Sequence, residues 1–316
     1  MTPHRTIRLG LVGAGAWGRN YIRTIAGLTG VVLARVASHN PDTASLVPPD
    51  CVVTPDWRDL VGAADLDGLI LAVPPKVQAT IAEAAIRARL PLMLEKPVAI
   101  GVAETQRLAE LASQAEVPVL VDHVYLFHPA YVALKEMVRK HGGARAIRSV
   151  GGAHGPFRPD LPVLWDWAPH GVAMCLDLVG EPPSAVAGAC IRSEDTPDGR
   201  GEIWALDLKF PCGTEANVTV GNLMEARNRR FTAILSEGEV TFDDCREEKL
   251  VHRGAGGETA VPHAADRPLT RAVEAFVGGL TGHGLSGFGL DLALSVSRVI
   301  AMAERDGAVS CEGALA

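Results

Sequence analysis

The sequence predicts an α/β protein made of a doubly wound parallel sheet, followed by an α+β domain with a large, mostly antiparallel sheet. Short apolar runs alternate with amphipathic stretches from residue 7 to about residue 121. The glycine-rich segment Gly13-Ala14-Gly15-Ala16-Trp17-Gly18 directly follows the first run. After Asp122 the alternation gives way to strand-like runs separated by turn clusters. We therefore expect domains at residues 1–122 and 123–316, with the closing helices able to pack back on the first domain.

In the first domain, the expected strands are short runs rich in β-branched residues or leucine. Between them, apolar residues recur every three or four positions, as in helices that cover a sheet. The strands are expected at residues 7–12, 31–37, 68–73, 91–94 and 117–121, with a weak one near 52–53, and the helices at 17–28, 77–89 and 103–115.

The second domain is expected to begin with a helix at residues 129–141 and a strand at 146–153. A loop with three prolines then leads to a helix at 167–178. Strand-like runs at 184–253, separated by turns at 195–199 and 237–238, are typical of a meandering antiparallel sheet. Helices at 269–280 and 290–304 are expected to close the chain.

The composition excludes several classes of protein. With 316 residues, 47% of them hydrophobic and 21% charged, the chain is neither disordered nor fibrous. The net charge is -7 and no basic run interleaved with aromatic residues indicates a nucleic-acid surface, so a nucleic-acid partner is not expected. The longest apolar stretches, such as residues 69–73, are far shorter than the ~20 residues that span a bilayer. Without a secretory signal at the amino terminus, we expect a cytoplasmic protein with a small-molecule partner.

The cysteines and histidines do not show the spacing of metal ligands, and the cysteines include no C-x-x-C pair. We expect reduced, mostly buried thiols and no metal site. The cysteines are Cys51, Cys175, Cys190, Cys212, Cys245 and Cys311, and the scattered histidines are His123, His128, His154, His252, His263 and His283.

The glycine segment fits the pattern G-x-G-x-x-G between a strand and a helix, a context that indicates a dinucleotide site. Gly13 permits the tight turn, Gly15 lets the backbone approach a pyrophosphate, and Gly18 lets the helix pack on the strand. Ala16 and Trp17 lie in the same loop, where N–H groups at the helix start face the anion. The alternative is a plain tight turn.

Ser38 stands at the end of the second strand, ~20 residues after the loop, where NAD-selective proteins of this fold carry a carboxylate. Ser38 and His39 place no negative charge against a 2′-phosphate and could donate hydrogen bonds to it, so NADP is favoured modestly over NAD. In the alternative, Ser38 only caps a turn and the choice between the cofactors stays open.

Glu95-Lys96-Pro97 ends the fifth strand, and ligands of open α/β sheets bind at the carboxyl ends of strands. Lys96 is therefore expected to face the cofactor crevice. Pro97 restricts the backbone of Lys96 and allows either a cis or a trans bond before it. The alternative is a surface lysine at a strand end.

Asp166 is expected to cap a helix that has Pro169 in its first turn. Asp166 and His170 would then lie one turn apart on one face, where the carboxylate favours the protonated imidazole. His170 could act there as a general acid or base. In the alternative, Asp166 is only a cap and His170 is a packed histidine.

Together these segments resemble the glucose-fructose oxidoreductase / inositol 2-dehydrogenase family, usually called Gfo/Idh/MocA. The resemblance covers nearly the whole chain, and its specific part is Glu95-Lys96-Pro97 in register with the glycine loop. It rests on residues 12–20, 72–75, 95–97, 125–131 and 165–170.

The resemblance implies a Rossmann domain and a second domain whose open sheet helps to form a homodimer or homotetramer. It also implies NAD(P)-dependent oxidation or reduction at an alcohol carbon of a sugar, nucleotide-sugar or cyclitol. Lys96, Asp166 and His170 fall on the family's catalytic positions, and Ala72, Pro74 and Glu95 fall in its cofactor-binding segments.

The expected reaction is hydride transfer between a carbinol carbon and C4 of nicotinamide, with the hydroxyl proton exchanged with His170. Lys96 would stabilise charge on the reacting oxygen, and Asp166 would orient the substrate or His170. Aromatic residues near a helix start often pack in a core instead of binding substrate. The candidate substrate-binding residues are Tyr125, Phe127, Arg158 and Trp165.

Four positions depart from the commoner family pattern. Ala168 replaces a frequent glycine, Gly171 replaces a frequent acidic residue, and Lys76 and Gln78 replace frequent histidines near the expected nicotinamide contacts. Two other functions stay open: an enzyme that breaks a glycosidic bond by transient oxidation and elimination, and a non-catalytic regulator that senses NAD(P).

Overall fold

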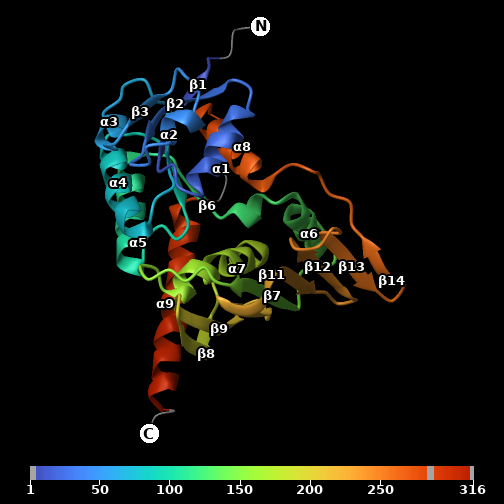
Figure 1. Ribbon diagram of the computed structural model, residues 1–316. Helices are drawn as coiled ribbons and strands as arrows, with labels where there is room; N and C mark the ends of the chain where they lie inside the picture. Colours follow the sequence, from blue (N-terminus) through green and yellow to red (C-terminus); the bar gives the residue numbers. More distant parts are fainter. Residues whose placement is uncertain (1–4, 283–287, 314–316) are drawn as a thin grey trace. The chain divides into compact units, whose positions relative to one another are not determined.

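The computed structural model describes residues 5–282 and 288–313. The chain divides into two compact units, each with its own sheet (Figure 1). Unit 1 runs to Asp122 and also takes in Leu269–Leu294. Unit 2 covers His123–Pro268 and the chain from Ser295 onward.

Unit 1 contains a six-stranded parallel sheet in the order β3-β2-β1-β4-β5-β6, which confirms the doubly wound sheet expected from the sequence. All four residues of β4 are buried, as its continuous apolar run predicts for a strand covered on both faces. The strands are β1 (Ile7–Val12), β2 (Val31–Ala37), β3 (Val52–Thr54), β4 (Gly68–Leu71), β5 (Leu92–Glu95) and β6 (Val119–Asp122).

Helices α4 and α5 pack against each other beside this sheet (Figure 1). They enclose a core that includes Leu69, Leu71 and Leu94, all fully buried. Phe276 of α8 lies so close to the start of β4 that a Cβ added at Gly68 would meet its ring at 2.8 Å. The helices of unit 1 are α1 (Gly18–Ala26), α2 (Thr43–Leu46), α3 (Arg58–Val61), α4 (Pro75–Arg87), α5 (Val102–Ala115) and α8 (Pro268–Leu280).

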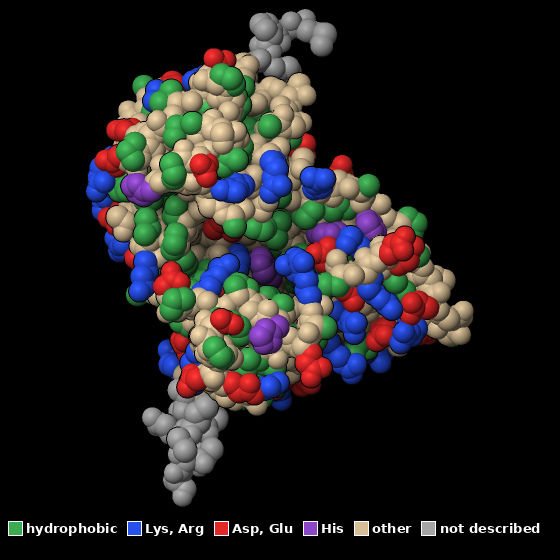
Figure 2. All heavy atoms as spheres, in the orientation of Figure 1, with side chains coloured by type: hydrophobic (Ala, Val, Ile, Leu, Met, Phe, Trp, Pro, Cys, Tyr) green, Lys and Arg blue, Asp and Glu red, His purple; other side chains and the backbone are tan. Residues whose placement is uncertain are grey.

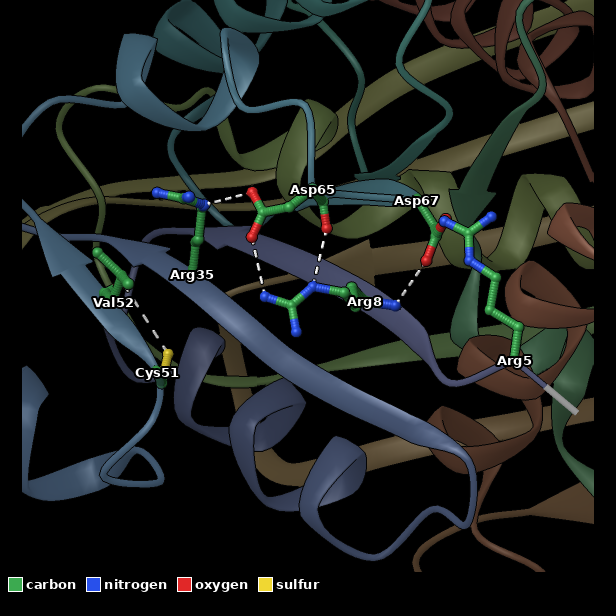
Figure 3. Close-up of polar contacts among 7 residues, drawn as sticks. All are labelled: Arg5, Arg8, Arg35, Cys51, Val52, Asp65 and Asp67. Carbon is green, nitrogen blue, oxygen red and sulfur yellow. Dashed lines mark hydrogen bonds and ion pairs between the residues drawn. The ribbon is translucent and has the colours of Figure 1, made fainter. Parts of the chain in front are cut away.

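Charged side chains join the beginning of β1 to the loop before β4 (Figure 3). Asp65 accepts hydrogen bonds from Arg8 of β1 and Arg35 of β2, both at 2.8 Å. Asp67 accepts from the backbone N–H of Arg8 at 2.8 Å and from Arg5 at 2.6 Å. Hydrogen bonds from Arg35 and Arg8 lower the pKa of Asp65. These contacts lie at the amino end of β1, and the glycine loop follows its carboxyl end.

Unit 2 contains an eight-stranded sheet in the order β14-β13-β12-β11-β7-β10-β9-β8. Its strands pair antiparallel except for β7 and β10, which are parallel. The expected α+β domain with a mostly antiparallel sheet is therefore confirmed. The strands are β7 (Ala146–His154), β8 (Ala185–Thr196), β9 (Gly199–Lys209), β10 (Glu215–Gly221), β11 (Leu223–Ile234), β12 (Glu239–Asp243), β13 (Leu250–Gly254) and β14 (Gly257–Ala260).

Helices α6 and α7 cover one face of this sheet (Figure 1). The strands alternate accordingly: Ser149 of β7 and its partner Phe231 of β11 are buried, whereas Arg148 and Arg230 beside them are exposed. The later part of α9 lies close to β8, because a Cβ at Gly188 would meet the Ala303 backbone. The helices of unit 2 are the 3-10 helix η1 (Val124–Phe127), α6 (Pro129–Lys140), α7 (Val163–Val179) and α9 (Leu290–Gly313), which begins in unit 1.

Helix α7 corrects one expectation, because it begins at Val163 and not at Trp167. The backbone N–H of Asp166 already donates to the carbonyl of Pro162, so Asp166 is inside the first turn and is not the N-cap. Pro169 therefore lies in the helix interior, where the carbonyl of Trp165 loses its usual i+4 donor. Pro162 precedes the helix in an extended conformation, which sets the earlier start.

The cysteines are less buried than expected. Cys51 and Cys175 are buried, Cys190 is half-buried, and Cys212 and Cys245 are exposed. Burial raises the pKa of the Cys51 thiol to about 11. The side chain of Cys311 and the whole of His283 lie outside the described residues.

Candidate active site

The glycine loop connects β1 to α1, and its glycines differ in the space around them. Gly13 has φ +97°, and a Cβ there would lie 2.3 Å from the carbonyl oxygen of Ala72. A Cβ at Gly18 would lie 2.0 Å from the carbonyl oxygen of Gly13. Nothing lies within 4 Å of a Cβ added at Gly15. The loop is thus tightly closed at both ends and open at Gly15, where Ala16 and Trp17 are also exposed. This open cradle fits a dinucleotide pyrophosphate.

Ser38 directly follows β2. Its backbone N–H donates to the carbonyl of Thr54 at 2.9 Å, and its hydroxyl accepts from the backbone N–H of Asn40 at 3.1 Å. Ser38 therefore does cap a turn in this structure, and its oxygen keeps capacity for a second hydrogen bond. The neighbouring His39 is exposed. The geometry is compatible with either cofactor.

The segment that carries Lys96 is fixed by a buried side chain of α4. Gln78, which is 1% exposed, donates to the carbonyl oxygens of Glu95 at 2.7 Å, Pro97 at 3.1 Å and Val98 at 3.2 Å. Its own carbonyl accepts from the backbone N–H of Glu95 at 3.0 Å. The bond between Lys96 and Pro97 is cis. The backbone on both sides of Lys96 is thus held by one amide group.

Two carboxyl groups, the half-buried Glu95 and the buried Asp122, lie beside Lys96. The Tyr21 hydroxyl lies 2.7 Å from Glu95 Oε1 and 2.6 Å from Asp122 Oδ2. A phenol has one proton to donate, so the second short contact requires a proton on one of the two carboxyls. Burial, and then the charge of Asp122, raises the pKa of Glu95 to about 8, while Tyr21, Lys96 and Trp17 oppose the shift. Burial also raises the pKa of Asp122 to about 6.

In unit 2, α7 carries Asp166 and His170. Asp166 is buried and lies 3.4 Å from Nη1 of Arg158, whose side chain is half-exposed. Tyr125 of η1 packs edge-to-face against His170, with 4.9 Å between the ring centres. Burial raises the pKa of Tyr125, so its hydroxyl stays protonated at neutral pH. These four residues bring an acid, an imidazole, a guanidinium and a phenol together within unit 2.

Two candidate substrate residues lie in the packed interior of unit 2. Trp165 is 2% exposed and donates its indole N–H to Glu304 of α9 at 3.1 Å. Phe127 is also buried. For both residues the geometry accords with the core-packing alternative.

A second charged cluster lies next to Tyr125. The guanidinium of Arg229, on β11, is 5.7 Å from the centre of the Tyr125 ring. Arg229 also lies 3.5 Å from Asp244, which in turn contacts Lys249 at 3.0 Å and His128 at 3.5 Å. Although burial opposes it, the hydrogen bonds from His128 and Lys249 lower the pKa of Asp244 well below its usual range.

Surface features of the described chain bear on the class of ligand. On the face shown in Figure 2, Lys and Arg side chains are interspersed with Asp and Glu over the strands near β12 to β14. Within residues 5–282 and 288–313, no group of three His, Cys, Asp or Glu residues could hold a metal ion. None of the helices in the same residues is long and apolar enough to cross a membrane.

Comparison with known proteins agrees with this geometry. The model of the Gfo/Idh/MocA oxidoreductase family, with an NAD-binding Rossmann fold, matches residues 7–123. A solved structure from Magnetospirillum magnetotacticum MS-1, assigned as an oxidoreductase, is 38% identical, has a TM-score of 0.88, and covers 94% of this chain and 99% of its own. The chain belongs to the Gfo/Idh/MocA family.

As a Gfo/Idh/MocA member, the chain is an NAD(P)-dependent oxidoreductase. UDP-N-acetylglucosamine 3-dehydrogenase from Acidithiobacillus ferrooxidans is 24% identical over 84% of this chain and 83% of its own length. Inositol 2-dehydrogenase from Acidothermus cellulolyticus is 33% identical, over 44% of this chain and 42% of its own length.

Within unit 1, the residues singled out from the sequence lie at the carboxyl ends of β1, β2, β4 and β5. Sequence reasoning missed the roles of Tyr21 and Asp122, and treated Gln78 only as a departure from the family pattern. Asp122 could have been found by the rule that strand ends carry ligands, because it ends β6. No sequence signal indicates that Gln78 holds the Lys96 segment, or that Arg229 lies on Tyr125.

Proposed function

We propose that this chain transfers a hydride between nicotinamide and a carbinol or keto carbon of a sugar, nucleotide-sugar or cyclitol. The observation that carries the proposal is the pairing, in one sheet, of the open glycine loop after β1 with the fixed Lys96 segment after β5. The names of the two curated relatives support the substrate class, because one acts on a nucleotide-sugar and the other on a cyclitol.

The proposed cofactor residues are those of the loops in unit 1. Gly13, Gly15, Ala16, Trp17 and Gly18 would hold the pyrophosphate through backbone N–H groups. The segments with Ala72, Pro74 and Glu95 complete the set at the ends of β4 and β5. Bound nicotinamide would supply the hydride acceptor or donor.

The adenosine end of the proposed site favours NADP modestly. Ser38 and His39 replace the carboxylate that would repel a 2′-phosphate. The Ser38 hydroxyl accepts from the backbone N–H of Asn40 and still has its own proton to donate to a phosphate oxygen.

The proposed catalytic residues are Lys96, His170 and Asp166. The Lys96 ammonium would hydrogen-bond the reacting oxygen and stabilise the negative charge that develops there. His170 would take the hydroxyl proton during oxidation and return it during reduction. Asp166 would orient His170 or the substrate, and Tyr125 and Arg158 are the proposed substrate-binding residues. Trp165 is not proposed for this role, because its side chain is buried and its indole N–H is bonded to Glu304.

Titration with NADPH and NADH, followed by tryptophan fluorescence, tests the cofactor part of the proposal. Trp17 is 43% exposed and lies in the glycine loop, so its emission should change on binding. We expect tighter binding of NADPH than of NADH. Tighter binding of NADH would show that Ser38 only caps the turn after β2. Binding of neither cofactor would overturn the proposal.

Turnover of sugars and cyclitols, measured by absorbance of the reduced nicotinamide, tests the catalytic part. Lys96→Ala and His170→Ala should bind cofactor normally but lose activity by about 10²- to 10⁴-fold. Lys140→Ala and His141→Ala, at exposed positions on and after α6, are the matched controls. Unchanged activity in the first pair would refute their roles. Cofactor binding without any turnover would favour a sensing regulator, and tightly retained NAD with glycoside cleavage would favour elimination.

A further inference from the structure

A cationic cluster beside Tyr125 has no part in the proposed hydride and proton transfers. The Arg229 guanidinium carbon is 5.7 Å from the Tyr125 ring centre, and the same ring packs edge-to-face against His170 with 4.9 Å between the ring centres. One side chain thus links Arg229 to the proposed general base. The two distances together are short enough for one small molecule to reach both residues.

The cluster carries more positive than negative charge. Asp244 is its carboxylate, and it contacts two permanently charged residues, Arg229 and Lys249. Arg227 is close enough to Tyr125 to act on it electrostatically, yet it makes no hydrogen bond or ion pair within residues 5–282 and 288–313. His128 also donates to Asp244, so that carboxylate has little capacity left to balance another cation.

Arg229 has donor groups left for a ligand. Its side chain is 35% exposed, and its contact with Asp244 is long, at 3.5 Å between Nη1 and Oδ2. A guanidinium has five N–H donors in a planar fork, of which that contact uses one. The remaining edge matches two oxygens of a phosphate or a carboxylate.

Arg227 and Arg229 stand two residues apart on β11, where the register with β7 shifts between Leu223 and Asn228 and is regular from Asn228 onward. The charges of both arginines act on the Tyr125 hydroxyl. Arg229 emerges on the face that α6 and α7 cover farther along, because Phe231 and Ala233 are buried on that face. Arg230 emerges on the opposite face and pairs with Asp243 at 3.1 Å.

We propose that the substrate carries an oxyanion group, a phosphate or a carboxylate, which Arg229 and Arg227 bind beside Tyr125. This inference rests on the proposed function, since it assigns a further part of the same substrate. It places the charged group next to Tyr125 and the reacting carbinol toward His170. A neutral cyclitol would offer the two arginines no anionic group.

Binding without turnover tests the inference directly. Calorimetric titration of the full chain, saturated with its oxidised cofactor, uses glucose 6-phosphate, glucuronate and neutral glucose as probes. We expect at least one charged probe to bind tenfold or more tightly than glucose. Tighter binding of glucose 6-phosphate would identify the oxyanion as a phosphate, and tighter binding of glucuronate would identify it as a carboxylate. If neither binds more tightly than glucose, or if none of the three binds, the inference is wrong.

Three variants locate the charge. Arg229→Gln and Arg227→Gln should each lower the affinity for the preferred charged probe by about tenfold or more, because a charge-assisted hydrogen bond is lost. Arg230→Gln, on the other face, should change it less than twofold. Arg227→Gln alters an exposed side chain, so it keeps the test valid if Arg229→Gln fails to fold. Equal effects at all three positions, or none, would overturn the subsite.

The outcomes separate this inference from the proposed function. A chain that binds glucuronate through Arg229 but oxidises or reduces nothing would contradict the proposed function and leave the subsite standing. A chain that turns over a neutral cyclitol, with unchanged KM and kcat in Arg229→Gln, would contradict the subsite alone.

Discussion

Glu95 and Asp122 face the same buried hydroxyl, and this makes unit 1 sensitive to pH. Their pKa values in the folded chain, about 8 and about 6, lie above those of exposed carboxyls. The folded state therefore binds more protons than the unfolded chain at pH values between about 4 and 8. The stabilisation is complete below that range and is lost as pH rises through it.

We expect Asp122→Asn to remove part of this pH dependence. With Asp122 neutral, Glu95 loses one of the two causes that raise its pKa. Between pH 5.5 and 8.5 the unfolding free energy of the wild type should fall further than that of the variant. The difference should be about 1.4 kcal/mol for each unit of carboxyl pKa elevation that the substitution removes. Urea unfolding at four pH values measures the difference. Asp50→Asn, at an exposed position, is the control, and parallel curves for wild type and Asp122→Asn would contradict the prediction.

Gln78 gives a second prediction at the residue scale. Gln78→Ala leaves buried backbone groups around Lys96 without their partner, so unfolding free energy should fall by about 1–3 kcal/mol. Because the Lys96 segment also loses its fixed position, kcat should fall while KM changes little. Gln106→Ala, which removes a bond to Glu110 on the surface of α5, should do neither. A loss of stability with normal kcat would show that Gln78 is structural only.

At the scale of elements, two glycines in the loop between β1 and α1 should have different roles, Gly18 in stability and Gly15 in cofactor binding. Gly18→Ala places a Cβ against the Gly13 carbonyl and should cost more than about 2 kcal/mol of unfolding free energy. Gly15→Ala meets no atom within 4 Å, so its stability should be normal while the cofactor binds about tenfold more weakly. Unfolding and cofactor titrations of both variants check this. Normal cofactor affinity in Gly15→Ala would show that the pyrophosphate lies elsewhere.

In α7 the expectation of a helix is confirmed, whereas its expected start, with Asp166 as the N-cap, is wrong. Its apolar, helix-forming pattern predicted a helix, but Pro169 and Asp166 were assigned to its start because those residue types favour first turns. Tertiary packing instead buries Val163, Leu164 and Trp165 within the helix. The same packing explains Gly171, since a Cβ there would meet Ser149 Oγ at 2.8 Å and Val218 Cγ1 at 2.9 Å. An acidic side chain has no room at this contact.

For the whole molecule, the oligomeric state stays a prediction that follows from family membership. We expect a homodimer or homotetramer, with the uncovered face of the unit 2 sheet as the surface involved. Sedimentation equilibrium should give two or four times the chain mass of 33.3 kDa. A mass of one chain at micromolar concentration would contradict this prediction.

The fold class, most strand and helix positions, and the glycine loop could be predicted from the amino-acid sequence alone. These depend on local periodicity and on glycine conformations, both of which a single chain segment specifies. The sequence also indicated Lys96, because the motif stands at the end of a predicted strand.

The groups that surround those residues are seen only in the folded structure. Gln78 reaches Glu95 across 17 positions of sequence, Tyr21 reaches Asp122 across 101, and Arg229 reaches Tyr125 from a different strand of unit 2. Such contacts depend on how helices and strands pack together, and no local pattern encodes them. The motifs were therefore predictable. The side chains that hold the Lys96 segment in place, share a proton with Asp122, or bring charge to Tyr125 were not.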